Sequence, residues 1–539
     1  VARSEQLLAK PGQFTFATNH GIMQNLALWH ASLAFPALPR GEEYQRLARR
    51  RITDQMKFFI SDEGVVLEHS AGYHLFGLEL FGMAFRYLDL MHQPAPPEWI
   101  EKYQRAKKFY AALRRPDGSL PTFGDTGDDT LPLGPLVTTF DQDHRPQPLA
   151  YQAQWKPPSA VNVYPVSGYA IWWDGLEFWP SPRNLSQTVV AWSNFPSQSH
   201  KHADEMSVLF WAAGQTWLSN IGYWPYDDKW RGTIESWAGS NAPHLVGENP
   251  GAPRTTTLIS SASSSQMSAL ELERTESENY VARRQVIHCQ PNLWLVLDNT
   301  SGPEARRTRT TWTSASDVTW QPGPTPESFW LESPRVPDRL NMFFLGSHGA
   351  EDRLLRGSTT PFAGWQLEHS VPVPASALVV EEPARNSWAA TVWTWEKSGA
   401  AEKIDPAPQM THWTDATHWE MQLPGPAGGL ALLRQDDMLW LHSAHGAVAE
   451  LRLMAPPNVG PAIAELRHQF VAAQSRYPVF SANLRRRKKI TLLLSGILLL
   501  QEILFLMYTR LRGPRVHMLK GLSVVAWIGG GLWLVVFFF

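Results

Sequence analysis

The hydrophobic pattern of the chain changes its period once, near residue 160. Between Gly21 and about Tyr110, apolar side chains recur every three to four residues, which is the spacing of one helix face. From Gly168 onward, short runs rich in β-branched and aromatic residues alternate with turn residues, as is typical of strands. A run of helices followed by a run of strands predicts an α+β chain with an all-helical part and an antiparallel β-sandwich part.

Three parts are predicted from this pattern. Residues 1–160 form the helical part, residues 161–480 form the β-sheet part, and residues 485–539 form a basic linker with two apolar segments. A chain of 539 residues is too long for one ordinary core, which agrees with several units. The loop-forming residues Arg115 to Pro135 break the helical period before the strands begin.

The two apolar segments, 490–508 and 521–539, are each long enough to cross a membrane. At about 1.5 Å per residue a helix of this length spans about 28 Å, close to a bilayer core of about 30 Å. Neither segment contains Asp, Lys or Arg, and nine basic residues and a single acid, Glu502, lie in 485–539. These features favour a transmembrane hairpin over a pair of buried core helices.

Composition excludes some classes of protein. The net charge of −2 gives no reason to expect a nucleic acid as partner. A single cysteine, Cys289, rules out an intramolecular disulfide and any multi-cysteine metal site. The 25 Trp suit sugar faces and protein cores equally well, so they do not decide between these two uses.

Three motifs rich in His, Tyr and Asn occur in order along the chain. Asn19-His20-Gly21 opens one predicted helix, Tyr73-His74 opens another, and His200-Lys201-His202-Ala203-Asp204 precedes a predicted strand. Taken singly, a His at a helix start is commonly a hydrogen-bonded cap, and a Tyr on an apolar helix face is commonly a core residue. Their joint occurrence in this order favours a functional site.

With these motifs the chain resembles the heparinase II/III-like polysaccharide lyases, a superfamily that also includes alginate and oligoalginate lyases. The resemblance covers roughly residues 10–450 and is strongest from His200 to His244. It implies an incomplete (α/α) toroid followed by antiparallel β-sheets, and cleavage of a uronic-acid-containing polysaccharide by β-elimination. It also implies catalytic roles for Asn19, His20, Tyr73 and His200. Relatives carry helical sequence before the Asn-His pair, so we expect part of the toroid to precede residue 1.

The chemistry of β-elimination needs these residue types. Removing the C5 proton of a uronate adds negative charge beside a carboxylate, so hydrogen-bond donors such as Asn19 and a His must first neutralise that carboxylate. A base then takes the C5 proton while an acid protonates the leaving O4 oxygen. Tyr73 and His20 are the candidates for this pair, and the sequence leaves open which is the base. His200 is expected to hold the carboxylate or to tune Tyr73.

The resemblance also implies a zinc site and a substrate-binding arginine. The residues that match the zinc ligands of relatives are His202, Asn220 and His244. Asn220 stands where relatives have Asp, and a neutral amide is a poor zinc ligand, so a hydrogen-bonded structural role is an equal alternative. Arg231 is predicted to bind a substrate carboxylate or, equally, to form a structural ion pair. Asp125 follows Gly124 in a loop and is interpreted as a turn residue.

We therefore predict a membrane-anchored lyase that acts on an acidic polysaccharide and faces the periplasm from a bacterial inner membrane. The alternative, from a different class, is a non-catalytic membrane-tethered module that binds polysaccharide. A glycoside hydrolase finds little support, because the motifs lack paired carboxylates. The sequence does not determine which polysaccharide is bound or the oligomeric state.

Overall fold

The computed structural model describes residues 1–127, 159–175, 185–192, 200–276, 279–396, 407–425 and 429–477. The predicted membrane segments, 490–508 and 521–539, lie outside these residues. Among the helices of the described ranges, none combines the length and the apolar character that a membrane crossing requires. The chain divides into two compact units, residues 1–51 with 471–539 and residues 52–470, which are described separately below.

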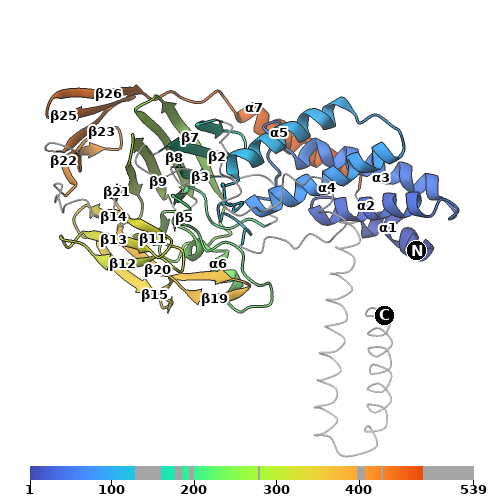
Figure 1. Ribbon diagram of the computed structural model, residues 1–539, viewed down its shortest axis with the longest axis horizontal. Helices are drawn as coiled ribbons and strands as arrows, with labels where there is room; N and C mark the ends of the chain where they lie inside the picture. The colour runs from blue at the N-terminus through green and yellow to red at the C-terminus, as the bar shows by residue number, and fades with distance from the viewer. Residues whose placement is uncertain are drawn as a thin grey trace, which may run out of the picture. The chain divides into compact units, whose positions relative to one another are not determined.

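The first unit contains the N-terminal helices (Figure 1). They are α1 (Ala2–Ala9), the short η1 (Pro11–Gln13), α2 (Asn19–Ala34) and the first part of α3 (Gly41–Phe59). Arg51 fastens the end of α1, because its guanidinium donates to the carbonyls of Leu8 and Ala9 at 3.0 Å each and lies 4.4 Å above the Phe14 ring. Burial of this guanidinium lowers the pKa of Arg51 to about 10.

The second unit begins with helices and continues as sheets, so the predicted order of helices followed by antiparallel strands is confirmed. Its helices include α4 (Ala71–Leu90) and α5 (Pro97–Leu113), which pack against each other. The later helices are α6 (Arg231–Ile234), η4 (Trp237–Gly239) and α7 (Gly460–Ser475), the last of which runs to residue 475 across the division between units.

The described strands of the second unit form three large sheets, a smaller four-stranded sheet and two short hairpins, and the strands pair antiparallel. The first sheet is β1 (Val161–Tyr164), β2 (Tyr169–Gly175), β3 (Leu185–Ala191), β4 (Ser207–Ala212) and β5 (Gln215–Leu218), in chain order. The second has the order β12-β13-β14-β21-β10-β9-β8-β7.

The bounds of the strands in that eight-stranded sheet are β7 Arg254–Ser263, β8 Met267–Glu276, β9 Val281–Cys289, β10 Leu293–Ser301, β12 Thr319–Pro322, β13 Ser328–Ser333, β14 Val336–Gly346 and β21 Ser387–Glu396. The four-stranded sheet consists of β6 (His244–Leu245), β11 (Arg307–Thr313), β15 (Glu351–Arg356) and β20 (Ser376–Pro383). The hairpins are β16 (Ser358–Thr359) with β17 (Phe362–Ala363), and β18 (Trp365–Glu368) with β19 (Val371–Pro374).

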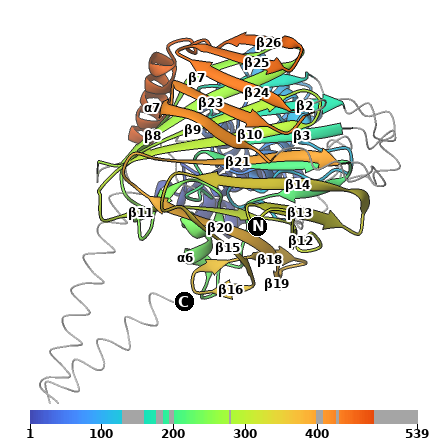
Figure 2. The same cartoon turned by 90° about the vertical axis from the view of Figure 1, so that its left-hand side faces the viewer.

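The third large sheet covers one face of the eight-stranded sheet (Figure 2). It is formed by β22 (Gln409–Asp415), β23 (His418–Leu423), β24 (Leu430–Gln435), β25 (Met438–Ser443) and β26 (Gly446–Arg452). Side chains alternate between the faces of a strand, so β10 serves two cores. Leu293, Leu295 and Leu297 pack toward the third sheet, whereas Trp294 and Val296 pack toward the first.

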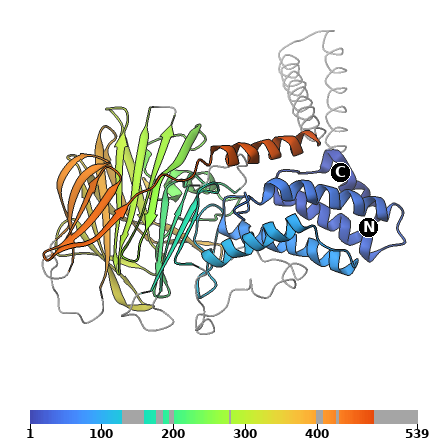
Figure 3. The ribbon, with the colours of Figure 1, turned by 90° about the horizontal axis from the view of Figure 1, so that it is seen from above.

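The layers of the second unit are therefore the third sheet, the eight-stranded sheet, the first sheet and then α5 (Figure 3). The outer face of the first sheet packs against Phe109, Ala112 and Leu113 of α5. At least ten Trp side chains are fully buried, which shows that the core takes up much of the Trp content. The same core contains Ala71 at the start of α4, Ala191 at the end of β3 and Leu209 near the start of β4. The predicted Tyr motif therefore begins close to the strand that the His motif precedes.

Candidate active site

A tight loop at Gly124 joins two of the predicted motifs. Gly124 has a φ of +55°, and a side-chain carbon there would lie 2.1 Å from the His69 carbonyl oxygen and 2.7 Å from that of His200. Its N–H donates to the Asp204 carboxylate at 2.8 Å. Glycine is required here because no other residue fits both the backbone angle and the space. The loop thus holds Asp125 between the start of α4 and the approach to β4.

Asp125 accepts hydrogen bonds from three of the predicted site residues. His200 Nδ1 donates to Oδ2 at 2.9 Å, and His202 Nε2 donates to Oδ1 at 2.8 Å. One nitrogen of the Arg231 guanidinium reaches both carboxylate oxygens, at 2.7 and 2.6 Å. The Asp125 residue is 1% exposed. A carboxylate with partners of this kind is a fixed acceptor that orients both imidazoles.

The charge state of Asp125 follows from these partners. Burial by itself raises the pKa of the carboxyl group, but the hydrogen bonds from His200, His202 and Arg231 outweigh burial and hold the pKa far below its usual range. Asp125 is therefore ionised at neutral pH. Because an ionised carboxylate is an acceptor only, neutral His200 carries its proton on Nδ1.

Tyr73 and His200 lie face to face in the structure. Their ring centroids are 3.4 Å apart, with 14° between the planes. Tyr73 is placed by the start of α4, where the Ser70 hydroxyl caps the helix by accepting from the Tyr73 N–H at 3.3 Å. Ser70 is itself bonded to the Thr126 hydroxyl at 2.8 Å, directly after Asp125. Two of the four predicted catalytic residues are thus in contact.

Tyr73 is 8% exposed, and its hydroxyl lies 3.3 Å from the hydroxyl of Tyr226. Burial, with a smaller contribution from the hydrogen bond to Tyr226, raises the pKa of Tyr73 well above its ordinary value. The phenol is therefore neutral near pH 7. A neutral phenol beside an imidazole is able to donate a proton, as an acid at a leaving oxygen must.

Arg231 forms ion pairs on both sides of its guanidinium. Besides Asp125, it contacts Glu235 through Nε at 2.5 Å, and it also donates to the Trp224 carbonyl. Burial lowers the pKa of Arg231, but the bonds to Asp125 more than offset this effect and raise it. This geometry is that of the structural ion pair which the sequence left as an alternative. Carboxylate binding by Arg231 stays a prediction.

Asn19 and His20 lie in the first unit, at the start of α2, which is preceded by Thr18 at the N-cap. Asn19 is 3% exposed, whereas His20 is exposed. The Gly21 N–H donates to the Thr18 carbonyl at 3.0 Å and so begins the helix. The predicted roles of Asn19 and His20 stay predictions.

Each of the three residues predicted to hold zinc makes a hydrogen bond in the structure. His202 bonds Asp125, and the His244 imidazole donates through Nδ1 to the Ala242 carbonyl at 2.9 Å. The Asn220 Oδ1 accepts from the Asn241 N–H at 3.3 Å. The Asn220 Nδ2 atom is buried and has no hydrogen-bond partner within the described ranges. An amide nitrogen is a donor and does not bind a metal.

The charges around His244 oppose a cation at that residue. Burial, followed by the positive charges of Arg274 and Arg309, lowers the pKa of His244 to about 3. A divalent cation at His244 would meet the same two positive charges. The neutral amide of Asn220 is a poor zinc ligand and two arginines lie near His244, so the structure gives no support for zinc at His202, Asn220 and His244, and that site stays a prediction.

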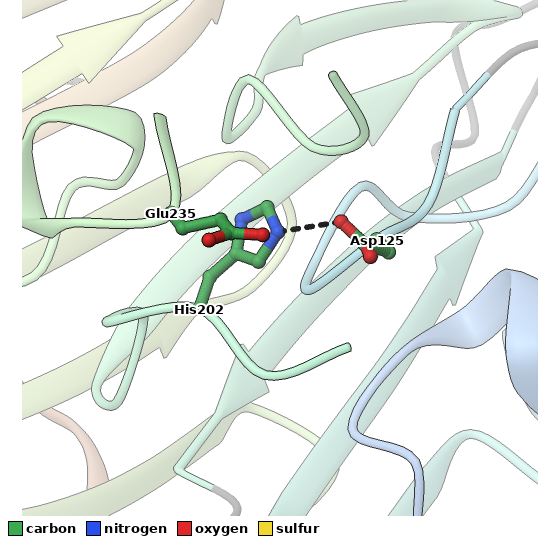
Figure 4. Close-up of side chains that lie close together, drawn as sticks. All are labelled: Asp125, His202 and Glu235. Carbon is green, nitrogen blue, oxygen red and sulfur yellow. Dashed lines mark hydrogen bonds and ion pairs between the residues drawn. The ribbon is translucent and has the colours of Figure 1, made fainter. Parts of the chain in front are cut away.

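A different group of potential ligands includes His202 (Figure 4). Within the described part of the chain, Asp125, His202 and Glu235 offer ligand atoms that all lie within 4.8 Å of one another. Figure 4 shows the Asp125 and His202 side chains pointing toward each other. Arg231 already bonds both Asp125 and Glu235, so a metal ion would have to displace a guanidinium. In the structure, these three side chains and Arg231 form an ion-pair network.

Chelation provides a test of this conclusion. Dialysis against a strong chelator is expected to leave both the thermal unfolding midpoint and any activity unchanged, since the hydrogen bonds of His202 and His244 need no metal. The measurement is a thermal melt with and without chelator, with elemental analysis of the purified protein. A lower midpoint that zinc restores would contradict it.

Three residues of the network were not predicted as functional. Asp125 was interpreted as a turn residue, and Tyr226 and Glu235 were not considered. The loop sequence Gly124-Asp125-Thr126-Gly127 is typical of a turn, and the partners of Asp125 lie 75 to 106 residues away. Tyr226 and Glu235 flank the Trp230-Arg231 pair, and this proximity to a predicted arginine is the signal that could have identified them.

Two domains of known protein families match this chain. The family described as heparinase II/III N-terminus matches residues 6–133, and the one described as heparinase II/III-like, C-terminal, matches residues 156–385. A comparison with curated proteins gave no match.

Several solved structures share the fold. A heparinase III with methylated lysines is 16% identical, with a TM-score of 0.62, and the alignment covers 78% of this chain and 65% of that one. Heparan sulfate lyase HepC from Pedobacter heparinus is 14% identical, with a TM-score of 0.59 and coverage of 82% and 67%. Another heparinase III is 13% identical, with a TM-score of 0.65 and coverage of 80% and 69%. The chain thus spans about two thirds of the length of these structures.

Proposed function

Because the chain carries both the N-terminal and the C-terminal domain of the heparinase II/III-like family, we propose that it is a polysaccharide lyase. Its substrate is an acidic polysaccharide that contains uronic acid, such as a glycosaminoglycan or alginate, and the reaction is β-elimination. The observation that carries this proposal is the stacked pair of Tyr73 and His200, with His200 held by the buried carboxylate of Asp125.

The neutral state of Tyr73 supports the assignment of Tyr73 as the acid of the proposed reaction. A phenol whose pKa is raised by burial keeps its proton at neutral pH, so Tyr73 is the acid that protonates the leaving O4 oxygen. His20 is the candidate that the sequence offers for the base that takes the C5 proton. The C5–H bond breaks, its electrons form the C4–C5 double bond, and the C4–O4 bond breaks as O4 receives the Tyr73 proton. Asn19 is the candidate donor to the substrate carboxylate, where it offsets the growing charge. His200, whose single proton is held by Asp125, stacks on Tyr73 and tunes it.

A direct assay tests the function. The protein is incubated with a panel of heparan sulfate, hyaluronan, chondroitin sulfate, alginate and polyglucuronate, and the ultraviolet absorbance of the unsaturated uronate product is followed. Growth of this absorbance on at least one polymer is expected. Binding of a polymer, measured by calorimetry, without any growth would instead support the alternative, a non-catalytic polysaccharide-binding module.

Membrane attachment is a separate part of the proposal and rests on the sequence of 490–508 and 521–539. We propose that this hairpin anchors the lyase with its body in the periplasm, next to the polymer it cleaves. Sedimentation of the full chain with membranes, and release of a chain ending at residue 484, would support the anchor. Recovery of the full chain in the soluble fraction would contradict it.

A further inference from the structure

Tyr226 is an exposed residue whose hydroxyl lies beside that of the buried Tyr73. Its hydroxyl lies 3.3 Å from the Tyr73 hydroxyl, 3.3 Å from Asp125 Oδ2 and 3.4 Å from His200 Nδ1. Tyr226 is 60% exposed, whereas Tyr73 is 8% exposed. The hydroxyl of the proposed acid is thus bonded to that of a residue that is largely open to solvent.

The ring of Tyr226 is held in place by its neighbours, so the position of its hydroxyl is defined. The guanidinium of Arg231 lies 4.3 Å from the ring centroid, and the ring of Tyr223 meets it edge to face at 5.8 Å. These contacts involve the ring and not the hydroxyl. Replacing Tyr226 by Phe would therefore keep the packing and remove only the hydroxyl group.

The reaction creates a need for such a connection. Each turnover takes one proton from Tyr73, and Tyr73 must regain a proton before the next turnover. Its low exposure leaves little direct access for water, and its raised pKa means that the phenolate strongly attracts a proton. A neighbouring hydroxyl that is open to solvent is suited to supply it.

We propose that Tyr226 is a positioning and proton-relay residue that reprotonates Tyr73 after each elimination. This inference rests on the proposed lyase function. The Tyr226 O–H bond breaks as a new O–H bond forms on the Tyr73 phenolate, and the resulting Tyr226 phenolate takes a proton from water or from a buffer acid. Asp125 accepts from the Tyr226 hydroxyl in the resting state and so keeps it aligned.

The test is the Tyr226→Phe variant, compared with Tyr223→Phe as a matched control. The ring of Tyr223 lies 5.5 Å from the Arg231 guanidinium and 5.8 Å from the ring of Tyr226, so both of these contacts are made by the ring and are kept in Phe. For Tyr226→Phe we expect a first turnover at the wild-type rate, followed by a steady-state kcat roughly 10²-fold lower with an unchanged KM. Imidazole buffer at rising concentration should restore kcat, since a small acid replaces the relay. Tyr223→Phe should behave as the wild type.

Other outcomes overturn the proposal. A first turnover slowed as much as later ones, with no response to buffer, would show that the hydroxyl acts in the chemical step or only in structure. A normal steady state in Tyr226→Phe would show that Tyr73 is reprotonated by another route. Absence of product from the wild-type protein on every polymer would instead remove the lyase function, and the relay with it.

Discussion

Replacing Tyr73 with Phe is expected to abolish elimination while the protein still folds. The substitution removes the hydroxyl that we propose protonates O4, and it keeps the ring that stacks on His200 at 3.4 Å. A positioned acid typically contributes roughly 10² to 10⁴ in rate, so kcat should fall by at least the lower figure. The measurement is the initial rate of unsaturated product formation, with thermal unfolding and polymer binding as controls for the fold.

The rates of the first and later turnovers in Tyr73→Phe and Tyr226→Phe distinguish the roles of the two hydroxyls. Loss of the Tyr73 hydroxyl should slow the first turnover, whereas loss of the Tyr226 hydroxyl should slow only the later ones. Turnover by Tyr73→Phe close to the wild-type rate would exclude Tyr73 as the acid. The stacked pair with His200 would then be a packing contact.

Replacing Asp125 with Asn is expected to lower both stability and activity. The amide removes the charge that pairs with Arg231 and places an NH₂ group against donors from His200 and His202. Breaking a buried ion pair by removing one partner typically costs about 3 to 5 kcal/mol. The free energy of unfolding, measured by denaturant titration, should fall by an amount in this range.

Asp117 provides a matched control for Asp125. It lies nearby in the chain and serves as a turn residue, since its Oδ1 accepts from the Ser119 N–H at 2.9 Å. Asp117→Asn preserves this acceptor and should change the free energy of unfolding by less than about 0.5 kcal/mol. Equal and small effects in the two variants would return Asp125 to the role of a turn residue.

The pH dependence of stability gives a second readout for Asp125. Burial opposes ionisation of this carboxyl group, but its three donors depress the folded-state pKa below the ordinary value of about 3.9. Its contribution is therefore complete above that value and is lost as the pH falls toward the depressed pKa. The wild-type free energy of unfolding should decline below about pH 4, and this component should be missing in Asp125→Asn.

The order of elements was predictable, whereas the sheet order was not. Strands such as β4 and β10 are buried on both faces, and so their sequences are continuous apolar runs that stand out. The place of β21 between β14 and β10 depends on pairing with segments about 50 and 95 residues away, which no local pattern encodes. Hydrophobic period identifies elements, and pairing partners arise from the packing of the whole unit.

The proximity of Tyr73 and His200 was predictable from the sequence, whereas the role of Asp125 in organising the site was not. Tyr73 and His200 were identified because they lie in motifs whose spacing resembles a known family. Asp125 was assigned to a turn because a Gly-Asp dipeptide in a polar loop is usually one, and its partners are distant in the chain. The structure shows that the same residue both follows a tight glycine and organises two imidazoles and a guanidinium.

The contacts of Asp125 also bear on how the polypeptide reaches its native state. They join residues that are 75, 77 and 106 positions apart, and each requires the closure of a long stretch of chain. Local hairpins and helices form well before contacts of such range. We therefore expect the carboxylate to meet these donors late in folding, so that a nascent or partly denatured chain holds most of its secondary structure before the proposed catalytic centre is assembled.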